Sequence, residues 1–196
     1  MKITVHGGAG VVGGNKVHVD LGDRGLFLDF GEPFDVGKKY CAEFIRPRAA
    51  RGLRDYLRLG MLPALDCYRP DLYPCDLSAS DMAPVKVDAL FLSHAHFDHY
   101  GNAGFLRRDI PVVASPMTYA VLRAYSELGK ANAPTELFDH VVRVEMKGES
   151  RVLVTPRTRG REVQGRRWVL TGEVLEDGPD WSKGSASEVV SGDGTL

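Results

Sequence analysis

The stretch that decides the fold lies in the middle of the chain and reads Ser93-His94-Ala95-His96-Phe97-Asp98-His99-Tyr100-Gly101-Asn102. Three of the six histidines of this 196-residue chain fall within it, with an aspartate among them. Imidazole nitrogens and carboxylate oxygens are ligands that a borderline divalent cation such as zinc accepts. A polar loop of individually satisfied histidines is the alternative, but the density of ligand-type side chains favours a metal site.

The segment before the histidines supports the same interpretation. Residues 85–92 are predicted to form a strand buried on both faces, because their apolar run leaves no polar face. The histidines follow at the carboxyl end of this strand, which is where open α/β sheets place their binding crevice.

The spacing within the stretch also has a geometric meaning. In extended or turning backbone, His94 and His96 point the same way, so both can reach one ion. Asp98 and His99 come after the turn and can reach a second ion or the water between two ions. A zinc site on a helix would instead use positions i and i+4.

Strands and helices alternate along the rest of the chain, which predicts an α/β sheet protein that begins with a β-meander. The helix over residues 116–128 has a good N-cap and first residue in Ser115-Pro116, and Gly129 is placed to end it. The predicted strands are 2–5, 15–19, 26–30, 85–92 and 111–114, and the other predicted helices are 49–59 and 103–107.

The composition is that of an ordinary globular chain. It is 43% hydrophobic and 26% charged with a net charge of −1, which excludes a disordered chain and a strongly basic one. No apolar run approaches the roughly 20 residues of a membrane span, and the first residues lack a signal-peptide core. The three cysteines match no zinc-knuckle spacing and are expected to be reduced thiols. We therefore expect a cytoplasmic protein without a membrane partner.

One main domain is expected over residues 1–150, followed by an extension over residues 151–196. Residues 151–167 carry six arginines and one glutamate, whereas residues 168–196 carry six acidic residues and one lysine. Residues 182–196 are rich in glycine and serine and are predicted to be a solvated loop or tail. The extension is interpreted as partly loop, or as the start of an incomplete downstream part.

The pattern His-x-His-x-Asp-His resembles the signature of the metallo-β-lactamase superfamily, and Leu28-Asp29-Phe30-Gly31 resembles the first motif of that family. The resemblance implies an αββα-type fold and a site for two zinc ions, with Mn2+ or Fe2+ as alternatives. It implies that His94 and His96 bind the first ion. It also implies that Asp98 and His99 bind the second ion and are the catalytic residues. Asp29 would support the metal-binding loop from behind, fixing the orientation of its ligands.

The opening glycine-rich stretch, Gly7-Gly8-Ala9-Gly10-Val11-Val12-Gly13-Gly14-Asn15-Lys16, is similar to the entry of ribonuclease J and its β-CASP relatives. A generic hairpin with glycines at positive φ is the alternative. A phosphate-cradling loop is disfavoured, because no Gly-Lys-Ser/Thr follows.

The family completes its site with a third histidine, a bridging aspartate and a final histidine further along the chain. After His99 the chain contains only His140, which is interpreted as a surface or packing residue, with a ligand role as the alternative. Leu170-Thr171-Gly172-Glu173 is the nearest match to the family's Thr-Gly-Asp strand end. The chain therefore looks like the N-terminal half of the family fold, and its partner would be a C-terminal half or a longer full-length chain.

The resemblance implies hydrolysis by a metal-activated hydroxide, and a phosphodiesterase or nuclease acting on RNA is the preferred interpretation. Residues 46–69 hold six arginines against two aspartates. Within them Arg51, Arg54 and Arg58 would share one face of the predicted helix and bind phosphates. A solvated helix face is the alternative explanation for these arginines. The alternative functions are a small-molecule hydrolase of the thioesterase or lactonase type, and an inactive metal-binding remnant.

Overall fold

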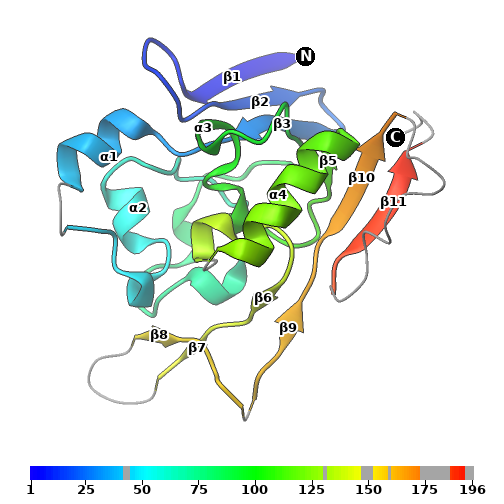
Figure 1. Ribbon diagram of the computed structural model, residues 1–196. Coiled ribbons are helices and arrows are strands. Elements are labelled where there is room, and N and C mark those ends of the chain that lie inside the picture. Colours follow the sequence, from blue (N-terminus) through cyan, green and yellow to red (C-terminus); the bar gives the residue numbers. More distant parts are fainter. Residues whose placement is uncertain (42–44, 130–131, 147–151, 159, 173–185, 193–196) are drawn as a thin grey trace.

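A computed structural model describes residues 1–41, 45–129, 132–146, 152–158, 160–172 and 186–192. Its centre is a seven-stranded sheet with the strand order β1-β2-β3-β4-β5-β10-β11 (Figure 1). The strands are β1 Lys2–Gly7, β2 Lys16–Asp20, β3 Gly25–Phe30, β4 Ala89–Phe91, β5 Val112–Ala114, β10 Arg167–Thr171 and β11 Glu188–Gly192.

The sheet is mixed. Strands β1, β2 and β3 pair antiparallel as a meander, whereas β3, β4, β5, β10 and β11 pair parallel with their neighbours. The carboxyl ends of the parallel strands therefore meet at one edge, where the chain leaves β4 toward the histidines. Strands β10 and β11 come after residue 150 and yet belong to this same sheet.

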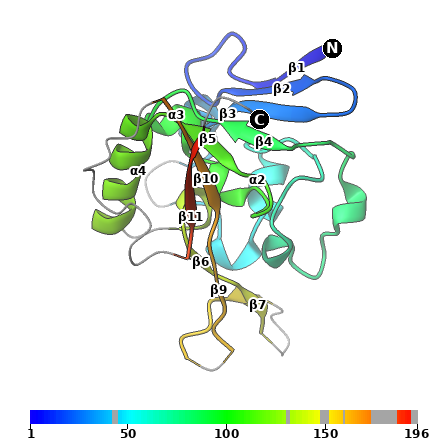
Figure 2. The same cartoon turned by 90° about the vertical axis from the view of Figure 1, so that its right-hand side faces the viewer.

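Four α-helices surround the sheet: α1 Phe34–Tyr40, α2 Arg54–Arg58, α3 Phe97–Tyr100 and α4 Pro116–Leu128. Single 3-10 turns occupy Ala49–Arg51, Pro70–Leu72, Ala79–Asp81, Ala103–Phe105 and Ala133–Thr135. Two small ribbons lie at the other end of the molecule from α3 (Figure 2). They pair β6 His140–Val141 with β9 Val163–Gln164, and β7 Val144–Glu145 with β8 Leu153–Val154.

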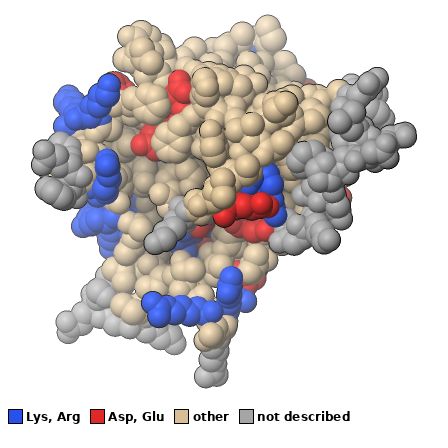
Figure 3. Space-filling view, viewed as in Figure 1, with Lys and Arg blue, Asp and Glu red and all other residues tan. Residues whose placement is uncertain are grey.

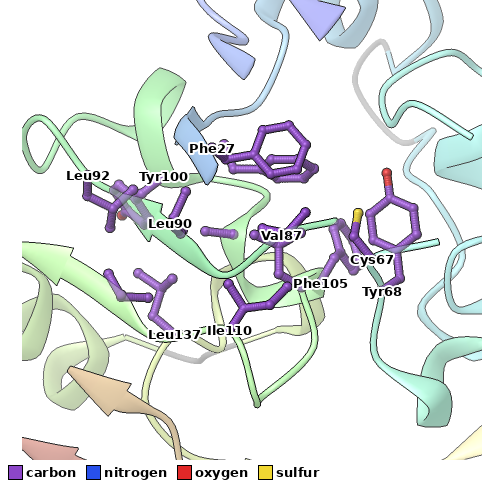
Figure 4. Close-up of a cluster of buried hydrophobic side chains, with 14 of the residues drawn as sticks. Phe27, Cys67, Tyr68, Val87, Leu90, Leu92, Tyr100, Phe105, Ile110 and Leu137 are labelled. Carbon is purple, nitrogen blue, oxygen red and sulfur yellow. The ribbon is translucent and has the colours of Figure 1, made fainter. Parts of the chain in front are cut away.

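Large apolar side chains fill the space between the sheet and the segments that cover it (Figure 4). Under α4, Tyr119 meets Trp168 of β10 edge-on at 5.0 Å between ring centroids, and Phe138 stacks on Trp168 at 4.8 Å. Ser115 caps α4, because its hydroxyl oxygen accepts the backbone N–H of Thr118. These contacts fix β10 against β5 and α4.

The mixed α/β architecture confirms the predicted fold class. The meander of three strands, the strand after Pro111 and the helix after Ser115 all form within two residues of their predicted bounds. Among the described residues no helix is both long enough and apolar enough to cross a bilayer.

The helix predicted over residues 49–59 is wrong in its extent. A 3-10 turn ends at Arg51, Gly52 follows with φ of 51°, and only Arg54–Arg58 is helical. A β-carbon on Gly52 would lie 2.0 Å from the carbonyl oxygen of Leu72, and that carbonyl accepts the N–H of Leu53. The hydrogen bond between Leu53 and the distant turn at Leu72 therefore interrupts the helix.

Three other predicted elements differ from the structure. Within the strand predicted over residues 85–92, only residues 89–91 form a strand. These are the residues that pair with Leu26–Leu28 of β3. Residues 103–105 make a single 3-10 turn and not a helix to Arg107. Within the predicted tail over residues 182–196, Glu188–Gly192 forms β11, because its backbone pairs in parallel with β10. Residues 182–185 and 193–196 lie outside the described part.

Candidate functional site

Asp29 is the buried acidic residue behind the histidine loop. It lies near the carboxyl end of β3 with a side chain only 12% exposed, and its φ of 58° is in the left-handed region. Few residues other than glycine adopt that region, although aspartate is enriched there. The conformation places the carboxylate against the loop that follows β4, where it accepts hydrogen bonds from the backbone N–H and the hydroxyl of Ser93 at 2.8 Å each.

A chain of hydrogen bonds runs from this carboxylate to two imidazoles. Nδ1 of His99 donates to Asp29 at 2.7 Å. The hydroxyl of Ser93 also donates to Asp29, so its oxygen is left to accept from Nδ1 of His94 at 2.9 Å. This network assigns the ring proton to Nδ1 in both histidines, so each Nε2 carries a lone pair. In His99 that lone pair accepts a hydrogen bond from the side-chain amide of Asn15. Imidazoles held in this way by a carboxylate are typical of metal ligands.

The three imidazoles of the loop lie together. The ring centroids of His94 and His99 are 4.0 Å apart, and those of His94 and His96 are 4.5 Å apart. A carboxylate oxygen of Asp98 lies 3.6 Å from Nε2 of His99. Burial lowers the pKa of His94, and the neighbouring His99 and His96 lower it further, which favours the neutral, metal-binding form at pH 7.

The loop is held from below by residues of the N-terminal meander. A β-carbon on Gly31 would lie 1.6 Å from the carbonyl oxygen of Asp98, so only glycine permits the start of α3 to approach β3 this closely. The N–H of Asn15 donates to that same carbonyl at 3.2 Å, and its side-chain amide donates to Nε2 of His99 at 3.2 Å. The sequence analysis noted Asn15 in the glycine-rich stretch but did not assign it to the site.

Lys16 and Ser93 are further residues that sequence reasoning did not assign to the site. Lys16 is 1% exposed, its ammonium donates to the carbonyl oxygen of Gly31, and it lies 5.3 Å from the centre of the Phe30 ring. Burial lowers the pKa of Lys16 to about 7, opposed by the nearby carboxylate of Glu32. An isolated lysine after a run of glycines carries no signal of burial, whereas Ser93 could have been found from its position between a buried strand and His94.

The donor chemistry of the loop fits a divalent cation, since it offers unprotonated imidazole nitrogens and a carboxylate. The side chains as placed do not surround a single point. Among the residues that the structure describes, no group of three or more His, Cys, Asp or Glu side chains is arranged to hold a metal ion. The side chains of His94, His96, Asp98 and His99 are thus close together without forming a closed ligand set.

The arginines expected to bind nucleic acid lie elsewhere and do not form one helix face. Arg51 precedes the break at Gly52, and both Arg51 and Arg54 pair with Asp76 at 2.5 and 2.6 Å. Their charges lower the pKa of Asp76 despite the opposing effect of its desolvation. Arg58 lines a separate cavity near α1.

His140 lies in β6, at the opposite end of the molecule from α3 (Figures 1 and 2). It is 3% exposed, and its ring is 3.8 Å from Asp71. Burial and the neighbouring Arg108 and Arg69 lower its pKa to about 3. This position identifies His140 as a packing residue and excludes it as a ligand beside His94.

Comparisons with known proteins identify the family of the chain. The sequence profile of the β-lactamase superfamily domain matches residues 68–176, more than half of the chain. The crystal structure of a protein of unknown function from Enterococcus faecalis V583 is similar at 26% identity with a TM-score of 0.48. That match covers 63% of this chain and 28% of the other, so the chain spans less than a third of that protein's length. No curated protein matches the chain.

The profile match begins after the glycine-rich stretch of residues 7–14, so the likeness of that stretch to the ribonuclease J branch stays a prediction. The superfamily consists mostly of hydrolases and commonly binds divalent metals. The matched segment contains the whole histidine loop and the parallel strands β4, β5 and β10 around it. The chain belongs to the β-lactamase superfamily.

Proposed function

We propose that this protein is a metal-dependent hydrolase that cleaves phosphodiester bonds, with RNA as the expected substrate. The proposed metal ligands are His94, His96, Asp98 and His99. The observation that carries the proposal is the hydrogen-bond chain from Asp29, because it holds two imidazoles by Nδ1 at the carboxyl edge of the sheet and leaves Nε2 of each ring as the unprotonated nitrogen.

Zn2+, or Mn2+ or Fe2+ in its place, would supply a Lewis acid that lowers the pKa of a bound water toward about 7. Asp29 keeps the loop in position through Ser93 and His99. Asp98 and His99 are the proposed catalytic residues. In this proposal the carboxylate of Asp98 would take the proton that the attacking water loses, and the leaving oxygen of the phosphodiester would receive a proton in return. This reaction needs no serine or cysteine nucleophile.

A small-molecule hydrolase is the second candidate, and two observations favour it. Asp76 pairs with two of the three arginines proposed to bind nucleic acid and so offsets part of their positive charge. In addition, a cavity of about 380 Å3 adjoins the loop at Phe97, which is the size of a small-ligand site. Thioesters and lactones are the substrates to test for this candidate.

The test is a hydrolysis assay on the chain loaded with Zn2+ or Mn2+. The substrates are bis(4-nitrophenyl) phosphate, an RNA 20-mer, and a thioester and a lactone as small-molecule probes. We expect slow, metal-dependent cleavage of the phosphodiesters that His96→Ala abolishes. The control His6→Ala, which changes a histidine of β1, should retain this metal-dependent cleavage. Cleavage that survives His96→Ala, or that is confined to the thioester or the lactone, would overturn the proposal.

The expected partners are an RNA substrate and the remainder of a longer chain, and the expected location is the cytoplasm. The family resemblance supports the second partner, since the third histidine and the bridging carboxylate have no counterpart near the loop among the described residues. If the remainder of a longer chain supplies this histidine and this carboxylate, adding that remainder should raise the rate of hydrolysis.

A further inference from the structure

A cavity of about 380 Å3 lies beside the histidine loop and plays no part in the hydrogen-bond chain. Phe97 forms part of its wall, and Phe97 stands between His96 and Asp98 in the sequence. A molecule in the cavity would therefore contact a residue of the histidine loop.

The polar groups of the cavity are mostly hydrogen-bond donors. They are the guanidinium of Arg46, the hydroxyl of Tyr56 and the side-chain amide of Asn132, against one carboxylate, that of Glu32. Burial raises the pKa of Tyr56 above its ordinary value, so its hydroxyl keeps its proton and can donate. Such a set of donors is suited to the oxygens of an anion.

Arg46 shares the cavity with the carboxylate of Glu32. Burial raises the pKa of Glu32, and the charges of Lys16 and Arg46 oppose that rise. Lys16 is buried on the side of β2 and Gly31 and is not among the residues that line the cavity. Among the described residues, Arg46 makes no ion pair that satisfies hydrogen-bond distance, and its bond is to the carbonyl oxygen of Cys41 at 3.3 Å.

A second cavity, of about 390 Å3, adjoins the first through Cys41, Arg46 and Pro47. Arg58 lines it as well, and Lys38 and Lys39 occupy the last turn of α1 nearby. Lys and Arg side chains gather on this face over α1 and α2 (Figure 3). Their positive potential would draw anions toward Arg46.

We propose that the cavity beside Phe97 binds a phosphate group of the substrate, with Arg46 as its anchor. This inference rests on the proposed function, because it names the substrate feature that the hydrolase recognises beside the bond it cleaves. The phosphate can belong to a mononucleotide or to the end of an RNA strand, and the two sources share the same recognition. Arg46 is the specificity-determining residue in this proposal, and it takes no part in the bond cleavage.

The test measures binding and not turnover, so it stands apart from the hydrolysis assay. Adenosine 5′-monophosphate and uncharged adenosine are titrated calorimetrically into the metal-free chain and into Arg46→Gln, Arg46→Lys and Arg167→Gln. Arg167 is the matched control, since it is exposed on β10 and lies outside both cavities. We expect the monophosphate to bind better than adenosine, with a loss of about 10-fold or more in Arg46→Gln, since a hydrogen bond to a charged group contributes about 1.5–3 kcal/mol.

Arg46→Lys should recover part of the affinity, and Arg167→Gln should leave it unchanged. Equal binding of adenosine and its monophosphate, or an unchanged affinity in Arg46→Gln, would overturn the proposal. Competition by a 5′-phosphorylated RNA octamer, and not by its 5′-hydroxyl form, would identify the RNA end as the source of the phosphate. If neither octamer competes, the source is a small phosphorylated molecule. If the monophosphate binds as expected but the loaded chain hydrolyses nothing, the proposed function fails while the phosphate site stands.

Discussion

Two regions of the molecule place a histidine next to a buried carboxylate, and they differ in what the histidine can do. In the loop after β4, Asp29 holds the rings of His99 and His94 by Nδ1, directly or through Ser93, and both residues are partly exposed. Around β6, the ring of His140 is enclosed, and neither of its nitrogens has a hydrogen-bond partner among the described residues.

The carboxylates also differ in their partners. Around β6 the carboxylates of Asp71 and Glu136 pair with Arg69 at 2.7 and 2.8 Å, and Arg143 pairs with Glu136 at 2.9 Å. Cations saturate these oxygens, so the cluster holds the fold together. Among the described residues, Asp29 accepts hydrogen bonds from Ser93 and His99 alone, so it orients uncharged side chains of the loop and not a cation. The comparison teaches that an accessible lone pair, and not the His–Asp pairing itself, marks the chemical site.

The largest effect should come from the cluster around β6. Asp71→Ala leaves the buried Arg69 without one of its two carboxylates, and we expect a loss of about 3–5 kcal/mol in the free energy of unfolding. Urea unfolding followed by circular dichroism measures it. The control Asp109→Ala removes an exposed partner of Arg107 and should change stability by no more than about 0.5 kcal/mol. Equal losses in the two variants would show that the cluster does not stabilise the fold.

The next effect concerns the loop. Asp29→Asn replaces an acceptor of three hydrogen bonds, and we expect the Zn2+ affinity to fall about 10–100-fold while the fold is kept. Competition with a chromophoric chelator measures this affinity. The matched control is Asp20→Asn, where the carboxylate accepts only from the exposed N–H of Gly22. An affinity equal to that of the parent would mean that Asp29 does not orient the ligands.

A pH dependence should distinguish the two regions further. The pKa of His140 is about 3 in the folded chain against an ordinary 6.5, so between these pH values the unfolded chain binds the additional proton. Stability is therefore lost as the pH falls from about 6.5 toward 3, with a slope of up to about 1.4 kcal/mol per pH unit from this group. His140→Leu should reduce the slope measured by urea unfolding across that range. An identical slope in both proteins would show that His140 titrates normally.

The smallest effect lies in α4, away from both regions. Ser115→Ala removes the oxygen that accepts the N–H of Thr118, and we expect a loss of about 1 kcal/mol in the free energy of unfolding. Ser126→Ala in the same helix is the control and should cost nothing. The thermal unfolding midpoint of each variant provides the measurement, and equal midpoints would contradict the capping role.

Much of this fold could be predicted from local sequence. The meander and α4 follow from alternating apolar residues, turn residues and the Ser115-Pro116 cap, all of which act within a few positions. The break in the helix predicted over residues 49–59 could not be foreseen, because the backbone N–H of Leu53 pairs with the carbonyl of Leu72, 19 positions away. β11 was missed for the same reason, since its short segment becomes a strand only beside β10.

The site divides in the same way. The histidine loop could be located because its ligand-type residues are consecutive, and Asp29 because it ends a strand in a familiar motif. Asn15 reaches His99 from 84 positions away, and only the folded meander brings them together. Arg46 could not be chosen from the sequence among six neighbouring arginines, because what distinguishes it is the cavity beside Phe97 that it lines. Four of the other five pair with carboxylates, and the fifth, Arg58, lines the second cavity.

The most direct test of the account is a Zn2+ titration that compares the two histidine regions. Isothermal titration calorimetry is run on the parent chain, on the double variant His94→Ala/His96→Ala and on His140→Leu, each confirmed as folded by circular dichroism. The account predicts that the parent and His140→Leu bind Zn2+ with the same stoichiometry and affinity, and that the double variant loses this binding. Zn2+ binding that persists unchanged in the double variant, or that disappears in His140→Leu, would contradict it.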